Sequence, residues 1–344
     1  MLICIVCVFH ANILKFLPDF KGRDDLKAVI CADVLLGSVC IENLGGARLQ
    51  KWMTARNEKF AELIDRATQN NVSYVLLVGD LLGQNRVPES VIDTFFKAVQ
   101  TETRIHVIAL LSDDALERLN YRSDIPRNLH LISKTKRLDY SDDNISVSNV
   151  NAETLVQFSN KMQFVIKRDD SGKYIISVLE KEIVVPSFEP ISFDDARDKT
   201  FGFGVLSSSG SFESVDFSNY RFRDISITLF STDDKAEFIR KIEKALKSIE
   251  RSSFLRVTFL GRTAFGFSID TDAVNAYICK RVFYAEVYDN TVMDISEEDF
   301  VTDISLRSEF VRLALADETL SESERSRVIC CGWNVLNGKE VSAE

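Results

Sequence analysis

The chain has 344 residues, of which 45% are hydrophobic and 27% are charged, and its formal net charge is −10. This length is sufficient for two domains with separate cores, and the composition is that of an ordinary globular protein. The negative charge excludes a strongly basic surface that would bind nucleic acid through its phosphates alone, although a local basic groove is compatible with it.

The first 25 residues differ from the rest of the chain. Residues 1–9 are apolar, but His10, Lys15 and Lys21 interrupt the run before it reaches a membrane-spanning length. The run has neither a basic leading segment nor a small-residue cleavage site, so we do not expect a secretory signal. We interpret residues 1–25 as an extension outside the fold, of the kind that a misplaced start codon produces.

Seven cysteines are scattered along the chain. Cys4 and Cys7 have Cys-x-x-Cys spacing, but no second pair of this kind completes a zinc site. This usage is typical of a reducing compartment rather than of a disulfide framework. We therefore predict a cytoplasmic protein with no membrane partner.

From residue 27 to residue 147, apolar strand-like runs alternate with amphipathic helices, which is typical of an α/β sheet. We predict strands at 27–32, 73–78, 105–111, 129–133 and 145–148. A helix from Arg48 to Asn70 separates the first two strands, and another begins at Pro88, a residue suited to the first turn of a helix. Helices on both faces of this sheet would place its functional edge at the carboxyl ends of the strands.

The following residues divide into two parts. Residues 150–220 are rich in strand-forming residues, with a hairpin turn predicted at 169–172. From residue 221, the order strand–helix–strand–helix–strand predicts a smaller α/β unit. We predict its strands at 222–229, 255–261 and 282–289, and its helices at 233–251 and 271–279. We expect the first of these helices to bury Phe238, Ile239, Ile242, Leu246 and Ile249.

The C-terminal segment 295–339 is acidic and predicted to be helical. Within it, Ser321 and Glu324 have the spacing of a capping box, and Gly338 is suited to end the last helix. We therefore divide the chain into the extension 1–25, a first domain at 26–220, and a second domain with a helical tail at 221–344.

Three of the predicted strands end in acidic motifs. Asp33 follows the first strand, Asp80 the second, and Asp113 the third. Because the carboxyl ends of parallel strands meet at one edge of a sheet, we expect these three side chains on the same edge.

The order, spacing and surroundings of these motifs resemble those of the calcineurin-like metallophosphoesterases, in particular the SbcD/YhaO-type exonuclease subunits of DNA repair. Near the C-terminus, the stretches 285–291, 306–312 and 332–340 are also similar to YhaO-type proteins. The resemblance implies a metallophosphoesterase-type layered α/β sandwich, followed by a smaller α/β capping domain and a helical C-terminal tail.

The chain departs from the family at most positions that carry the chemistry. In the family, the three motifs read Asp-x-His, Gly-Asp-x-x-Asp and Gly-Asn-His-Asp. Here Leu35 replaces the first His, Gly83 the second Asp, Ser112 the Asn, and Asp113 the catalytic His. A two-metal site needs about seven nitrogen and oxygen ligands, several of them from histidine.

The chain has only three histidines, and none of them falls on a family ligand position. His10 lies in the extension, His106 begins a strand at the end opposite the motifs, and His130 alternates with apolar residues in another strand. The later family motifs that contain histidine have no counterpart, and we place the remnant of the last one at 201–206. A standard dinuclear centre therefore cannot be assembled from this sequence.

The remaining acids leave two interpretations open. By the resemblance, Asp33 and Asp80 match metal ligands, while Asp113 and Asp114 are weak candidates for catalytic residues. These acids either hold a single Mn²⁺ or Mg²⁺ weakly, or are vestigial acids that cap turns and helices with no cofactor bound.

The resemblance implies a subunit of a DNA repair nuclease complex. We predict a catalytically impaired subunit, a pseudoenzyme, that acts as a scaffold for an SbcC-type coiled-coil ATPase. One alternative is an active Mn²⁺- or Mg²⁺-dependent exonuclease that uses a carboxylate site, and another is a stand-alone binding module. Contact with DNA and a homodimer are also compatible with the resemblance.

Overall fold

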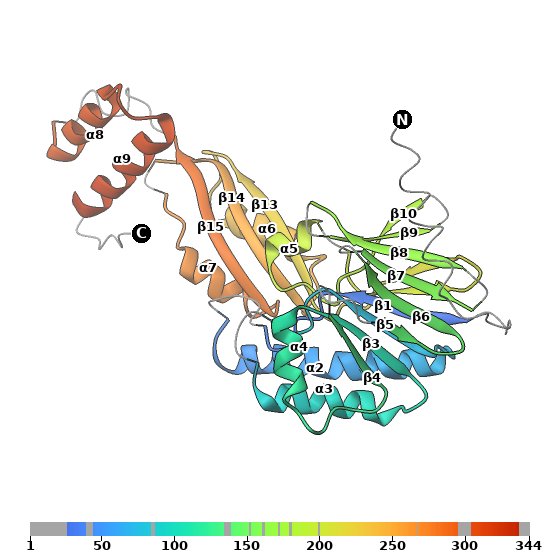
Figure 1. Ribbon diagram of the computed structural model, residues 1–344. Coiled ribbons are helices and arrows are strands. Elements are labelled where there is room, and N and C mark those ends of the chain that lie inside the picture. Colours follow the sequence, from blue (N-terminus) through green and yellow to red (C-terminus); the bar gives the residue numbers. More distant parts are fainter. Residues whose placement is uncertain are drawn as a thin grey trace, which may run out of the picture. The chain divides into compact units, whose positions relative to one another are not determined.

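A computed structural model describes the chain as two compact units that part between Asn219 and Tyr220 (Figure 1). The protein is a mixed α/β protein with a mixed sheet, an antiparallel sheet, a parallel sheet and C-terminal helices. The extension predicted at 1–25 lies outside the described residues. The described residues are 26–38, 44–83, 87–133, 139–150, 153–159, 162–170, 173–178, 181–198, 200–265, 267–294 and 304–336.

The first sheet of the N-terminal unit has the strand order β12-β11-β1-β2-β3-β4. Strands β1 to β4 run parallel, whereas β11 pairs antiparallel with β1, and β12 pairs antiparallel with β11. The first four predicted strands are confirmed. The six strands are β1 (Lys27–Ala32), β2 (Tyr74–Val78), β3 (His106–Leu111), β4 (Leu129–Ser133), β11 (Phe203–Ser207) and β12 (Phe212–Val215).

Three helices cover one face of this sheet, as Figure 1 shows. They are α2 (Gly46–Gln69), α3 (Glu89–Thr101) and α4 (Asp113–Asn120). The helices predicted from Arg48 and from Pro88 are thus confirmed. Their apolar stripes meet the side chains that alternate along the strands, because successive residues of a strand point to opposite faces.

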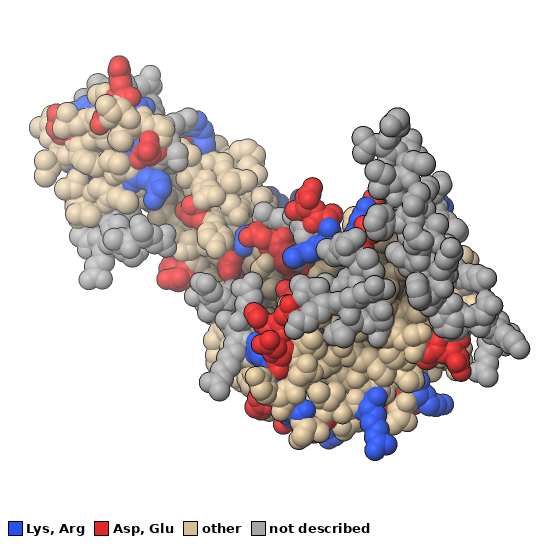
Figure 2. Space-filling view, in the orientation of Figure 1, with Lys and Arg blue, Asp and Glu red and all other residues tan. Residues whose placement is uncertain are grey.

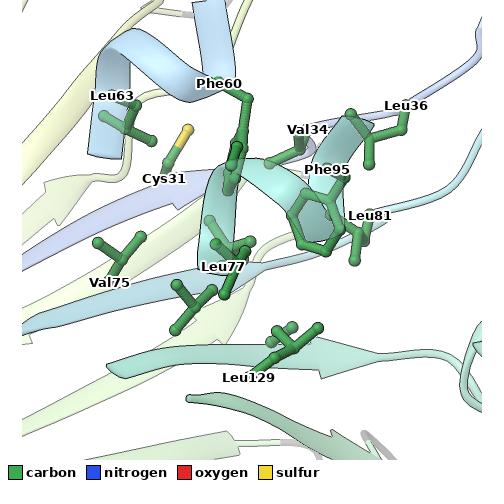
Figure 3. Packing of buried hydrophobic residues seen from close by; sticks show 14 of the residues in the cluster. Cys31, Val34, Leu36, Phe60, Leu63, Val75, Leu77, Leu81, Phe95 and Leu129 are labelled. Atoms are coloured by element: carbon green, nitrogen blue, oxygen red, sulfur yellow. The ribbon is translucent and has the colours of Figure 1, made fainter. Parts of the chain in front are cut away.

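Aromatic and branched side chains fill the layer between the helices and the sheet. In Figure 3, Phe60 of α2 and Phe95 of α3 lie side by side near Leu77 of β2. The two phenyl ring centroids are 4.7 Å apart and the rings are tilted, which is a favourable aromatic arrangement. Phe60, Phe95 and Leu77 are all buried, so this layer is a continuous core.

The second sheet of this unit is an antiparallel meander with the strand order β10-β9-β8-β7-β6-β5. It packs against the other face of the first sheet through a second apolar core that takes side chains from both sheets. Its strands are β5 (Asp139–Ser141), β6 (Ile145–Val150), β7 (Glu153–Phe158), β8 (Gln163–Arg168), β9 (Tyr174–Val178) and β10 (Lys181–Val184).

Two predictions for this unit are wrong. Among the described residues, α2, α3 and α4 cover one face of the first sheet and the meander packs against the other face, so the two helical layers predicted are not found. The strand predicted at 145–148 forms as β6 but belongs to the meander, where it pairs with β5 and β7. The hairpin predicted at 169–172 joins β8 to β9, although residues 171 and 172 lie outside the described residues.

The C-terminal unit contains the predicted three-stranded parallel sheet, in the order β13-β14-β15. Its crossover helices pack on one face of this sheet, above a core of alternate strand residues. Ile239 was expected in the buried stripe of α6 but is exposed, so that stripe is narrower than predicted. The elements are β13 (Arg221–Leu229), α6 (Lys235–Leu246), β14 (Ser253–Thr263), α7 (Thr271–Ile278) and β15 (Tyr284–Met293).

Two further helices end the described chain, α8 (Leu306–Ala316) and α9 (Glu322–Leu336). The predicted capping box is confirmed: the Ser321 N–H donates to the Glu324 carboxylate over 2.9 Å, and the Glu324 N–H donates to the Ser321 hydroxyl over 3.3 Å. Gly338, the predicted stop, lies outside the described residues. Among those residues, no helix is both long and apolar enough to span a bilayer.

Replacing Phe60 by Ala tests the core between the helices and the first sheet. We expect the free energy of unfolding of this unit to fall by about 3–5 kcal/mol, because a large buried ring leaves a cavity. Urea denaturation followed by the emission of buried Trp52, in a Trp333→Phe background, measures the change. Tyr121→Ala, at an exposed position, is the matched control and is expected to change the free energy by less than about 0.5 kcal/mol. Equal effects of the two substitutions would contradict this view of the core.

Candidate functional site

The three acids singled out by the sequence lie at the carboxyl edge of the first sheet. Asp33 directly follows β1, Asp80 comes two residues after β2, and Asp113 is the first residue of α4, which follows β3. Parallel strands bring these segments to one edge, as the spacing of the motifs predicts.

Asp33 and Asp80 are joined by a hydrogen bond. The Asp80 N–H donates to Oδ1 of Asp33 over 3.2 Å, and the Asp33 N–H donates to the carbonyl of Val78 over 2.9 Å. Asp33 is only 8% exposed and has a φ of 48°, in the left-handed region. Asp and Asn tolerate this region better than most residues. One carboxylate oxygen of Asp33 is therefore used to hold the segment after β2.

Gly79 makes this close approach possible. Its φ is 88°, and a Cβ at this position would lie 2.3 Å from Oδ1 of Asp33 and 2.8 Å from the ring of Tyr174. Any side chain here would displace either the carboxylate or the aromatic ring that packs from the second sheet. The glycine of the second motif thus has a structural reason of its own.

Beyond the strands, the segments after β1 and β2 continue side by side. The N–H of Leu35 donates to the carbonyl of Asp80 over 3.0 Å, and that of Leu36 to the carbonyl of Leu81 over 2.7 Å. Leu35, which stands where the family has its first His, has a φ of 52°. A leucine side chain cannot bind a metal ion, and the left-handed conformation is unfavourable for leucine by on the order of 1 kcal/mol. The loop therefore keeps a strained backbone without a ligand side chain.

Gly83 stands where the family has its second Asp. A Cβ at this position would lie 2.1 Å from Oγ of Ser38, so the loop after β1 occupies the space that a larger side chain would need. The N–H of Gly83 donates to the carbonyl of Leu36 over 3.1 Å. This position thus takes part in backbone pairing.

Arg56 binds the same loop through its guanidinium group. It is buried in α2, and its Nη2 donates to the carbonyl of Val34 over 2.7 Å. Its guanidinium lies 5.2 Å from the ring centroid of Trp52, a cation–π contact. The sequence analysis missed this residue. The available signal was a charged residue midway between Trp52 and Phe60 on the apolar stripe of a predicted helix.

Glu189 is a second buried charged residue that the sequence analysis missed. Its Oε1 accepts the N–H of Asn219 over 3.0 Å. Burial raises the pKa of its carboxyl, and the nearby charges of Arg56 and Lys59 oppose that rise only in part. The adjacent Phe188 N–H donates to the carbonyl of Ala32 over 2.8 Å, so this segment continues the sheet edge next to β1.

Asp113 is engaged at the start of α4. The hydroxyl of buried Ser133 donates to Oδ1 of Asp113 over 2.6 Å, and Ser112 caps the helix by accepting the N–H of Ala115 over 3.4 Å. An acid in the first helical turn is also favoured by the helix dipole. Asp114 is exposed.

These acids do not assemble into a metal centre. Within the described ranges, no three side chains of His, Cys, Asp or Glu lie close enough together to hold an ion. Phe201 and Gly202, in the stretch assigned to the last family motif, do lie near the end of β1: the thiol of Cys31 is 3.3 Å from the carbonyl oxygen of Gly202. Neither residue offers a ligand side chain. His10 lies outside the described residues.

The C-terminal unit has an apolar groove of about 570 Å³ between α6 and α7. Phe238, Ile242 and Phe267 line it, together with Lys235 and Asp270. This lining offers no cluster of acids or histidines for phosphoester chemistry. On the face shown in Figure 2, the described Lys and Arg side chains are scattered among Asp and Glu and form no continuous basic stripe.

No protein-family model matches the chain, and none of the curated proteins compared with it matches either.

Replacing Asp33 by Ala and by Asn separates the role of its side-chain oxygen from that of its charge. We expect Asp33→Ala to lower the free energy of unfolding by about 1–3 kcal/mol, because the Asp80 N–H loses its acceptor in a partly buried position. Asp33→Asn keeps an acceptor oxygen and tolerates the left-handed backbone, so its effect should be smaller. Urea denaturation measures both. Equal losses would show that the charge, rather than the hydrogen bond, is what the fold uses.

Proposed function

We propose that this protein is a metallophosphoesterase-like subunit, similar to the SbcD/YhaO-type subunits of DNA repair nucleases. In this proposal it is catalytically impaired and acts as a scaffold for a coiled-coil ATPase of the SbcC type. The layered N-terminal unit, with acids at the carboxyl edge of its first sheet, supports the metallophosphoesterase-type fold. The smaller βαβαβ unit and its two terminal helices correspond to the capping domain and tail that the resemblance implies.

The observation that carries the scaffold role is the apolar surface of α8 and α9. Leu306 and Leu313, one heptad apart on α8, are 74% and 64% exposed. On α9, Val328 and Val335 are 40% and 59% exposed with the same spacing. Apolar residues that repeat every seven positions form the seam through which helices pair in coiled coils. A coiled-coil partner offers the matching surface.

The two helices are positioned as one element. A Cβ on Gly332 of α9 would lie 2.1 Å from the ring of Phe310 in α8, so the helices approach closely at this glycine. Trp333 packs edge-on against Phe265, with ring centroids 4.5 Å apart. The Ser326 hydroxyl accepts the N–H of Met293 over 2.8 Å, which attaches α9 to the end of β15. A partner bound to this pair would therefore be held on the C-terminal unit.

The carboxyl edge of the first sheet supports the impaired catalytic role. Two-metal hydrolysis requires ions that clamp the phosphoryl group and activate water. Here the Asp33 carboxylate accepts a hydrogen bond from the backbone N–H of Asp80, and the Asp113 carboxylate accepts one from the hydroxyl of Ser133. The Asp33 and Asp113 carboxylates thus each accept a hydrogen bond within the fold, which supports the vestigial interpretation.

Charged substitutions on α8 test the partner surface. We expect the double variant Leu306→Asp and Leu313→Asp to lose co-purification of an ATPase with a long coiled coil, identified by mass spectrometry from the native host. The reason is that two carboxylates in an apolar seam remain desolvated and unpaired. Tyr121→Asp, at an exposed position that follows α4, is the matched control and should retain the ATPase. Loss in the control alone, or no such ATPase with any form of the protein, would contradict the scaffold role.

Calorimetric titration with Mn²⁺ tests the impaired site. We expect no binding heat in the micromolar range for the wild type or for Asp80→Asn, since too few ligands converge at the sheet edge. Micromolar binding to the wild type that disappears in Asp80→Asn would contradict this expectation and favour the active exonuclease. The same two proteins should then be compared for hydrolysis of linear duplex DNA.

A further inference from the structure

The opposite edge of the first sheet carries a polar cluster that the proposed function does not use. Tyr74 begins β2, His106 begins β3, and His130 lies near the start of β4. Tyr140 of β5 and Asp142, which directly follows β5, approach from the second sheet. The cluster therefore joins the two sheets at the amino ends of the parallel strands.

The two histidines form a direct hydrogen bond. Nδ1 of His106 and Nε2 of His130 are 3.0 Å apart. The ring centroids are 5.3 Å apart, close to the largest separation that such a contact allows, and the ring planes differ by only 14°. The rings thus lie nearly edge to edge in one plane, and the lone pair of one nitrogen faces the other nitrogen. This is the geometry of one shared proton and not of two lone pairs that converge on a metal ion.

The surrounding groups determine where that proton lies. The Tyr140 hydroxyl is 2.8 Å from Oδ2 of Asp142, and because a carboxylate can only accept, the hydroxyl donates to it. The Tyr140 oxygen, 3.2 Å from Nδ1 of His106, then accepts from that nitrogen, and the single Nδ1–H of His106 is shared between this oxygen and Nε2 of His130. His106 therefore carries a proton on Nδ1, and Nε2 of His130 is an acceptor.

Asp142 fixes this arrangement. Its carboxylate accepts the hydroxyls of Tyr74 and Tyr140 and the backbone N–H groups of Asn144 and Ile145. Burial acts to raise the pKa of this carboxyl, but the four hydrogen bonds outweigh burial and lower it. Asp142 therefore stays ionised across the range in which histidine titrates, and it continues to require both hydroxyl protons.

A proton added to His130 conflicts with this network. Protonated Nε2 would face the Nδ1–H of His106 across 3.0 Å. If His106 moves its own proton to Nε2, the conflict is relieved, and Nδ1 of His106 can no longer donate to Tyr140. We propose that the His106–His130 pair is a pH-sensitive clasp between the two sheets of the N-terminal unit, closed when His130 is neutral and released at Tyr140 when His130 is protonated.

The surroundings of His130 lower its pKa overall. Burial lowers the pKa of His130 and the proximity of His106 lowers it further, while the charge of Asp142 opposes them only in part. Asp143, in the turn after β5, is another acid close to the cluster, and its charge raises the pKa of Tyr74. Near pH 7, His130 is thus the neutral acceptor that the closed clasp needs.

His130 makes the folded protein more stable at neutral pH than at acidic pH. The unfolded chain binds a proton at His130 near pH 6.5, and the folded state binds it only at lower pH. The contribution of His130 to stability is therefore complete above about pH 6.5 and is lost as the pH falls through the folded-state pKa. For each pH unit between the two pKa values, the unfolding equilibrium constant rises about tenfold.

Urea denaturation of the full chain between pH 7.5 and pH 5.5 tests the clasp. We expect the wild type to lose stability over this range, and His130→Phe, which keeps a ring of similar shape but cannot titrate, to lose clearly less. Tyr121→Ala, at an exposed position, is the control and should keep the wild-type pH dependence. The same pH dependence in wild type and His130→Phe would overturn the proposal.

Ring-selective NMR of the histidines provides a second measurement that does not depend on the folding of a variant. We expect His130 of the wild type to be the Nδ1–H tautomer at pH 7.5 and to titrate with a midpoint below 6.5. We also expect Tyr140→Phe, which removes the oxygen that accepts from His106, to raise that midpoint. A wild-type midpoint at or above 6.5, or an Nε2–H tautomer of His130 at pH 7.5, would overturn the proposal.

Discussion

The close approach of Asp33 to Gly79 is the constraint on which the carboxyl edge of the first sheet depends. It requires a residue without a side chain at position 79 and a left-handed backbone at Asp33. Once both are in place, the segments after β1 and β2 pair through backbone hydrogen bonds, and Arg56 anchors the first of them at Val34. Asp33, the strained Leu35 and the buried Arg56 all belong to this one junction.

The two edges of the first sheet have different chemistry. At the carboxyl edge, acids are used as acceptors for backbone and hydroxyl donors, so their charges are held within the fold. At the amino edge, His106, His130 and Tyr140 share protons between two sheets, and Asp142 provides the fixed charge that orders them. The apolar core between the sheets separates these edges, so a change at one need not disturb the other.

In the C-terminal unit, the sheet buries its apolar side chains, whereas α8 and α9 expose several of theirs. Its parallel sheet is covered by helices on one face, where alternate residues such as Leu255 and Val257 are buried. Between them Arg256 faces the other side, where it pairs with Glu286 over 3.4 Å. That face also carries an aromatic cluster in which Phe254 packs against Phe222 and Tyr284. On α8 and α9, by contrast, large apolar side chains are in contact with water. Such residues, repeated at heptad spacing, are typical of a helix-docking surface.

Local patterns in the sequence determined the first four strands, the long helices, the βαβαβ order and the capping box at Ser321, because each depends on neighbours a few residues apart. The same patterns assigned the strand at 145–148 to the wrong sheet, since periodicity defines a strand but not its partner. They also placed Ile239 in the core, which is wrong. The reason is that burial of a helical residue depends on what packs against the helix, and the local pattern does not contain that information. Only the tertiary structure brought His106, His130, Tyr140 and Asp142 together, or showed that a side chain at Gly83 would meet the hydroxyl of Ser38. These contacts join segments distant in the chain, and their distances are set by the packing of whole sheets rather than by any local preference of the residues.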